Sequence, residues 1–230
     1  SGQYRDFAFY DKQLLRHDTD VIVYGEIRDH RAAKAFCRKA ETGGLALTTL
    51  HTNGVLGVPG TLIEQFNLPP AMISAPGLMR LFVHQRLLRK LCSCALPLDE
   101  AEAVYNQHNL SGEFANKQEK LSILFPGNLN CVKIVNPEGC EACGHKGEQG
   151  RLVVMEMVLL NTTDREFIAA QNYIGWEKHL ASQGWPDIRK HTLQRLWWGQ
   201  VDILSALEQV DNLIPVASED IYRQMSEALS

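Results

Sequence analysis

The sequence lacks the features that would point to a membrane span, an exported protein or a nucleic-acid binder. No apolar run approaches the roughly 18 residues that a membrane-spanning helix needs. The first residues, SGQYRDFAFYDKQ, have no uninterrupted apolar core of the kind found in signal peptides. Lys and Arg number 23 against 27 Asp and Glu, so there is no basic excess to attract phosphates. The composition therefore predicts a cytoplasmic protein with no nucleic-acid partner.

Four of the six cysteines form two close pairs, which are Cys92 with Cys94 and Cys140 with Cys143. Where no signal peptide is recognised, clustered cysteines bind a metal more often than they form disulfides. Four thiolates favour a closed, tetrahedral, structural zinc site. The first pair has one intervening residue instead of the usual two, so Cys131 or His145 could replace a ligand. Reduced cysteines without a metal are the alternative interpretation.

A strand, a helix and a second strand are predicted over residues 21–52. Residues 21–25 are a short apolar run typical of a strand buried in a parallel sheet. Asp29 can cap the following helix, which ends at Gly43-Gly44. Residues 45–52 form a second apolar run, rich in Leu and Thr. Such a succession is one crossover unit of a parallel sheet, so the fold class is predicted to be α/β.

The rest of the chain is predicted to be mainly helical, with one further strand. We expect helices at about 60–66, 99–108 and over most of 163–230, and a strand at 151–160. Residues 70–90 are predicted to be helical with a break near Pro76-Gly77, and 111–130 to be a polar loop.

Both predicted strands of the crossover unit end at a polar residue, Glu26 and His51. Ligands of open α/β sheets bind beyond the carboxyl ends of the strands, so the two residues share one crevice if their strands are neighbours. Glu26 could hold a divalent cation through water or polarise an attacking water, or it could pair with Arg28 or cap the next helix. His51 could sense a phosphate, or it could be a half-buried histidine bonded to the backbone.

Residues 14–53 closely resemble the secretion and pilus-assembly ATPases, the motor family of type II secretion and type IV pili. The matching motifs stand in the family's order and spacing: Leu15-Arg16, Asp18-x-Asp20, Gly25-Glu26-Ile27-Arg28-Asp29, Thr42-Gly43 and Thr49-Leu50-His51-Thr52. The resemblance continues to about residue 210, through Gln85-Arg86-Leu87, Arg89, the second cysteine pair, Gly150-Arg151 and Glu156.

The resemblance implies a RecA-like parallel-sheet ATPase domain that uses ATP and Mg²⁺. By this resemblance Glu26 is the acid of the Walker B segment, and His51 lies in the histidine box and senses the γ-phosphate. Arg28, Asp29 and Arg16 would support the nucleotide site or a subunit interface. The implied assembly is a homo-hexamer that meets an inner-membrane platform protein from the cytoplasmic side.

The sequence contains no G-x-x-x-x-G-K-[ST] loop, which would supply backbone donors and a lysine to phosphates. We therefore expect the C-terminal part of a larger ATPase, inactive as an isolated chain. The expected divisions are a RecA-like portion at 1–90, a cysteine-rich zinc insertion at 91–150 and a mostly helical region at 151–230. The alternative is a zinc-stabilised, non-catalytic binding module that docks to a membrane platform partner.

Overall fold

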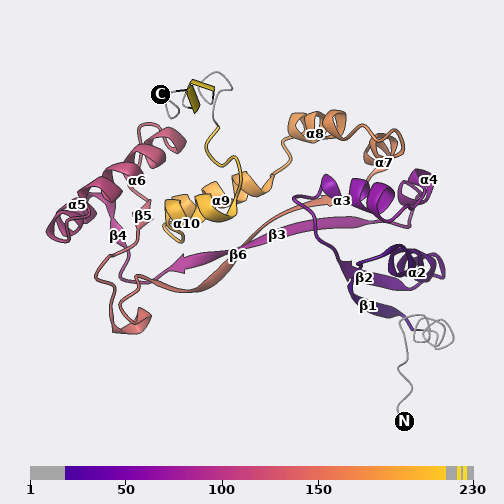
Figure 1. Cartoon of the computed structure of the whole chain (residues 1–230), viewed down its shortest axis with the longest axis horizontal. Coiled ribbons are helices and arrows are strands. Elements are labelled where there is room, and N and C mark those ends of the chain that lie inside the picture. Colours follow the sequence, from indigo (N-terminus) through magenta and orange to yellow (C-terminus); the bar gives the residue numbers. More distant parts are fainter. Residues whose placement is uncertain (1–18, 216–221, 224, 227–230) are drawn as a thin grey trace, which may run out of the picture. The chain divides into compact units, whose positions relative to one another are not determined.

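The computed structural model describes residues 19–215, 222–223 and 225–226, which form a mixed α/β fold (Figure 1). The chain divides into two compact units. Unit 1 holds the described residues up to 84 together with 156–185, and unit 2 holds 85–155 together with those from 186 onward. Each unit has a hydrophobic core of its own. The domain ranges expected from the sequence stay a prediction.

Unit 1 contains the crossover unit that the sequence predicts. Its elements are β1 (Val21–Glu26), α2 (His30–Glu41) and β2 (Leu45–Thr49). The two strands pair in parallel, and α2 lies against them (Figure 1). Tyr24 of β1 is buried and packs in a T-shaped arrangement with Phe36 of α2, at a centroid distance of 5.7 Å. Asp29 caps α2 as expected, because the Ala32 N–H donates to its Oδ1 at 2.8 Å.

Short helices complete unit 1. They are α3 (Gly57–Gly60), the π-helical turn η1 (Thr61–Gln65), α4 (Pro70–Ile73), α7 (Thr162–Ala169) and α8 (Tyr173–Ser182). Trp176 of α8 is fully buried, and its indole N–H donates to the buried Asp164 of α7 at 2.8 Å. The helix predicted near 60–66 is thus confirmed, with an earlier start at residue 57.

The helix predicted over residues 70–90 is confirmed only at Pro70–Ile73 and is wrong after the predicted break. After α4, the chain forms β3 (Leu81–Leu91), which pairs with β6 (Glu148–Leu159). The start of β3 meets the end of β6, since the Leu160 N–H donates to the Arg80 carbonyl at 2.9 Å. Leu and Arg favour helices locally, but pairing with a partner strand outweighs that preference. The strand predicted at 151–160 is confirmed and begins three residues earlier.

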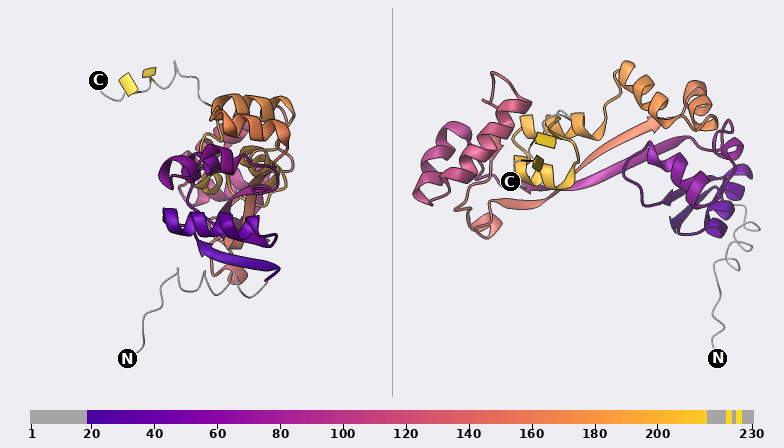
Figure 2. Two further views of the ribbon diagram at one scale, coloured as in Figure 1. Left: turned by 90° about the vertical axis from the view of Figure 1, so that its right-hand side faces the viewer. Right: turned by 45° about the horizontal axis from the view of Figure 1, so that its top comes forward.

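Unit 2 is built from short strands and helices around a second core. Its remaining elements are β4 (Leu96–Pro97), α5 (Leu98–Gln107), α6 (Ser111–Leu124), β5 (Lys133–Ile134), the 3-10 turn η2 (Glu141–Cys143), α9 (Ile188–Trp197) and α10 (Ile203–Gln209). Helices α5 and α6 lie side by side (Figure 2). The loop predicted over 111–130 is wrong for most of its length, because α6 fills it. Among the described residues, no helix has the length and apolar character needed to cross a membrane.

Candidate functional site

The carboxyl ends of β1 and β2 are held together by two hydrogen bonds. The Ile27 N–H donates to the Thr49 carbonyl at 2.9 Å, and the Thr49 hydroxyl donates to the Gly25 carbonyl at 2.7 Å. The strand register shifts between Val23 and Glu26, so that Glu26 pairs with Thr49. Such an irregularity re-aims side chains at a strand end. Glu26 therefore stands at the same sheet edge as the residues that follow β2.

Glu26 contacts two cationic or potentially cationic side chains through its two oxygens. Oε2 accepts from Arg28 Nη2 at 2.6 Å and from Nε at 2.8 Å, while Oε1 lies 3.0 Å from His51 Nε2. The hydrogen bond from Arg28 lowers the pKa of Glu26 below its usual value, so the acid is ionised at neutral pH. A carboxylate has about four acceptor positions, so Glu26 keeps capacity for a further donor or a hydrated cation.

The prediction that Glu26 and His51 lie close together is confirmed, because β1 and β2 are neighbouring strands. The alternative of a half-buried His51 is wrong, since its side chain is 94% exposed. Glu26 pairs with Arg28, which is one of the alternative roles that the sequence leaves open for it. The other alternative, capping the next helix, is wrong, because Asp29 caps α2. Arg16 lies outside the described residues.

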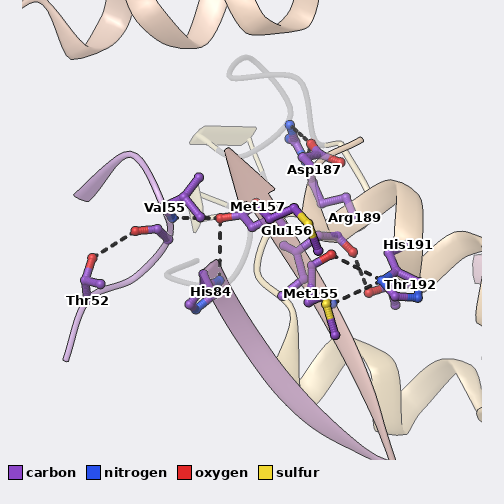
Figure 3. Close-up of polar contacts among 12 residues, drawn as sticks. Thr52, Val55, His84, Met155, Glu156, Met157, Asp187, Arg189, His191 and Thr192 are labelled. Carbon is purple, nitrogen blue, oxygen red and sulfur yellow. Dashed lines mark hydrogen bonds and ion pairs between the residues drawn. The ribbon is translucent and has the colours of Figure 1, made fainter. Parts of the chain in front are cut away.

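The segment after His51 is anchored by a side chain from a distant part of the chain (Figure 3). The Val55 N–H donates to Glu156 Oε1 on β6 at 2.9 Å, and the same oxygen lies 3.5 Å from His84 Nδ1 on β3. Glu156 and His84 are both buried. The sequence shows Glu156 as a motif match on a strand, but no local pattern indicates that it reaches the loop after His51.

The four paired cysteines converge in unit 2, and their sulfur atoms all lie within 4.8 Å of one another. The Sγ–Sγ distances are 3.6 Å for Cys92–Cys140, 3.8 Å for Cys140–Cys143 and 4.0 Å for Cys94–Cys143. Four sulfurs placed about 2.3 Å from one zinc ion stand about 3.8 Å apart at the corners of a tetrahedron. The cluster therefore fits the size and ligand chemistry of a structural zinc site.

The thiols of this cluster differ in how readily they ionise. Burial raises the pKa of Cys143, but N–H groups of Cys140, Gly147 and Lys146 outweigh it and lower the pKa to about 6. Burial, reinforced by the neighbouring thiols, raises the pKa of Cys94 to about 12. A bound cation would favour the thiolate form of all four residues. Of the described residues, Cys131 and His145 do not belong to the cluster.

The fold and these two sites define a mixed α/β protein with a strand-end acid–histidine pair and a four-cysteine cluster. Its fold is shared with solved ATPases at low sequence identity. The pilus retraction motor PilT, solved with bound ADP, aligns with a TM-score of 0.56 and 20% identity over 95% of this chain and 46% of that chain. The ATPase DotB of Legionella pneumophila aligns with a TM-score of 0.54 and 16% identity over 87% and 41%.

Residues 4–212 match the family described as Type II/IV secretion system protein, and the chain belongs to this family. The type II secretion system ATPase E of Vibrio cholerae is 32% identical over 89% of this chain and 36% of its own length. Protein E of Aeromonas hydrophila is 31% identical over 87% and 36%, and the pilus assembly ATPase PilB of Pseudomonas aeruginosa 28% over 90% and 33%. The chain thus spans about a third of these relatives, and its resemblance to secretion and pilus ATPases is confirmed.

Proposed function

We propose that this chain is the C-terminal part of the ATPase domain of a homo-hexameric motor, which hydrolyses ATP to drive pilus assembly or protein secretion. The observation that carries the proposal is the contact between Glu26 and His51 at the ends of two parallel strands. Membership of the Type II/IV secretion system protein family supports it. So do relatives named as a secretion ATPase and a pilus assembly ATPase.

The residues of this chain have distinct roles in the proposed reaction. Bound Mg²⁺–ATP would supply the phosphate to be cleaved and a cation that stabilises its charge. Glu26, ionised and held by Arg28, orients the attacking water or a water bound to the cation. His51 is exposed and lies against Glu26, so it can hydrogen-bond a terminal phosphate beside the acid. Arg28, Asp29 and Arg16 support the site or the subunit interface.

The parent motor would act in the cytoplasm at an inner-membrane platform protein. Its cysteine cluster would bind one structural zinc ion through Cys92, Cys94, Cys140 and Cys143. That cluster also favours the second candidate function, a zinc-stabilised module that docks to the platform without catalysis. The two candidates differ in whether Glu26 is needed for ATP turnover by the parent protein.

The 230-residue chain by itself is expected to neither bind nor hydrolyse ATP. Its sequence has no glycine-rich loop to cradle the phosphates and no lysine following such a loop. Calorimetry with Mg²⁺–ATP and a phosphate-release assay measure the two properties, with a longer parent protein as the positive control. Magnesium-dependent turnover by the 230-residue chain that Glu26→Gln abolishes would contradict this expectation.

Elemental mass spectrometry of the purified chain is expected to find about one zinc per chain, since four thiolates complete a tetrahedral site. Cys143→Ser should release the zinc, because it removes one of the four clustered sulfurs. The matched control is Cys131→Ser, which changes an exposed cysteine outside the cluster and should keep the metal. Zinc loss from the control, or zinc retention by Cys143→Ser, would show that the ligand set is different.

A further inference from the structure

Glu156 is a buried carboxylate whose contacts reach the loop that follows the histidine of the proposed site. It lies on β6 with 7% of its surface exposed. Its Oε1 accepts the N–H of Val55, a fully buried residue 101 positions earlier in the sequence. A buried carboxylate that accepts a backbone N–H holds that backbone more strongly than a neutral acceptor does. Glu156 is therefore an anchor for the loop between β2 and α3.

This loop follows a tight path around the anchor. A Cβ atom on Gly54 would stand 3.0 Å from Glu156 Oε1, and one on Gly57 only 2.3 Å from the Thr52 hydroxyl oxygen. The Thr52 hydroxyl donates to the Gly54 carbonyl at 3.0 Å, which folds the loop back on itself (Figure 3). The glycines let the backbone approach both partners closely, and the position of the loop follows from the position of Glu156.

His51 lies near the start of this loop, and its side chain has little packing of its own. Its side chain is 94% exposed, and its Nε2 lies 3.0 Å from Glu26 Oε1. The ring is therefore positioned mainly by the backbone on its two sides. On one side, Thr49 is fixed to β1 through Gly25 and Ile27. On the other side, the Val55 N–H donates to Glu156 of β6.

The residue before Glu156 is held by unit 2. The Met155 N–H donates to Nδ1 of His191, a residue of α9, at 3.1 Å (Figure 3). Glu156 belongs to unit 1 with Val55 and His84. Two consecutive residues of β6 are thus hydrogen-bonded within different units.

We propose that Glu156 is a positioning residue, which holds the loop after β2 so that His51 meets Glu26. The proposal rests on the proposed ATPase function for its effect on turnover, but its structural part stands on the Val55–Glu156 bond alone. Glu156 does not itself touch the reacting atoms. It acts through His51, so that removing its carboxylate would displace the His51 side chain from Glu26.

Hydrogen exchange of the 230-residue chain tests the anchor without any enzymatic activity. Glu156→Ala is expected to lower the protection of the Val55 amide about tenfold or more relative to core amides of unit 1, such as that of Ile22. Glu156→Gln keeps an oxygen that can accept the Val55 N–H and should preserve most of that protection. Glu148→Ala is the control, since Glu148 lies on the same strand and pairs with Arg89. Unchanged Val55 protection in Glu156→Ala would overturn the anchor.

A double-mutant cycle in the longer parent protein tests the positioning role. Glu156→Ala should lower kcat about tenfold with little change in KM, and Glu156→Gln should restore most of it. In a His51→Ala background, Glu156→Ala should have no further effect, because the residue through which it acts is gone. Additive losses would overturn the proposal. A parent protein without any ATPase activity would refute the proposed function, while the exchange experiment would still decide whether Glu156 anchors the loop.

Discussion

Glu26→Gln in the parent ATPase is expected to lower kcat by a factor of about 10²–10⁴, the range that a positioned general acid or base contributes. The substitution keeps the size of the side chain and an oxygen that can accept from Arg28. It removes the negative charge that attracts the proton of an attacking water or orients a hydrated cation. Because the hydrogen bond from Arg28 lowers the pKa of Glu26 below its already acidic usual value, that charge is present at neutral pH in the unmodified protein.

Steady-state phosphate release, with nucleotide affinity measured separately by calorimetry, checks this result. Affinity is expected to change far less than kcat, since the proposed role of Glu26 is in the chemical step. The matched control is Glu41→Gln, which makes the same chemical change at an exposed acid at the end of α2. If Glu26→Gln kept at least a third or so of the turnover, Glu26 would be no more than the structural partner of Arg28, and the non-catalytic module would be favoured.

The proposed acid–histidine pair could be predicted from sequence because both residues follow a strongly patterned segment. The apolar runs and the capping residue Asp29 define a crossover unit, and parallel strands bring their carboxyl ends to one edge. The pattern of this one segment is therefore enough to predict that Glu26 lies near His51. The four-cysteine cluster could also be predicted from sequence, because two close pairs of cysteines are typical of a metal site with four thiolate ligands.

The role of Glu156 as an anchor for the loop after β2 could not be predicted from the sequence. Its bond to Val55 joins residues 101 positions apart and depends on how β6 packs beside the loop. A glutamate on a strand is usually exposed, so local pattern offers no reason to bury this one. The error over β3 has a related origin. Its leucines and arginines are good helix formers, and only the pairing with β6 makes them a strand.

The missed helix α6 reflects a buried charge. Its buried residues are Phe114, Lys117 and Leu121, which are spaced three and four apart on one helix face. When Lys117 is counted as polar, the apolar positions no longer recur at helical spacing, and the pattern predicts a loop. In the structure, two of the partners of Lys117, Tyr105 and Asp202, come from outside α6, and a sequence pattern does not show such contacts.

Lys117→Met is expected to lower the free energy of unfolding of unit 2 by about 3–5 kcal/mol, the cost of leaving one member of a buried ion pair without its partner. The ammonium group has three donors, and all three are used. They contact the Tyr105 hydroxyl at 2.9 Å, Asp202 Oδ2 at 3.0 Å and Glu113 Oε1 at 2.9 Å. Methionine fills a similar volume but leaves the carboxylate of Asp202 buried without its counter-charge.

The pKa of Lys117 gives the sign of the pH dependence. Burial lowers this pKa, but Asp202, Tyr105 and Glu113 raise it by more, so it lies above the value for an unfolded lysine. A raised lysine pKa stabilises the fold fully below the unfolded value of about 10.4, and the stabilisation is lost as pH rises toward the folded value. The difference between Lys117→Met and the unmodified chain should therefore be constant across neutral pH and shrink only in strong alkali.

Urea unfolding, monitored by hydrogen exchange of the amides of unit 2, measures the effect. Lys120→Met is the control. Lys120 is half-exposed on the same helix, so its replacement should stay within about 0.5 kcal/mol. Adding Asp202→Asn to Lys117→Met should recover part of the loss, because the amide oxygen can still accept the Val135 N–H without a buried charge. A loss below about 1 kcal/mol for Lys117→Met would mean that desolvation cancels the pair, and α6 would then be held by Phe114 and Leu121 alone.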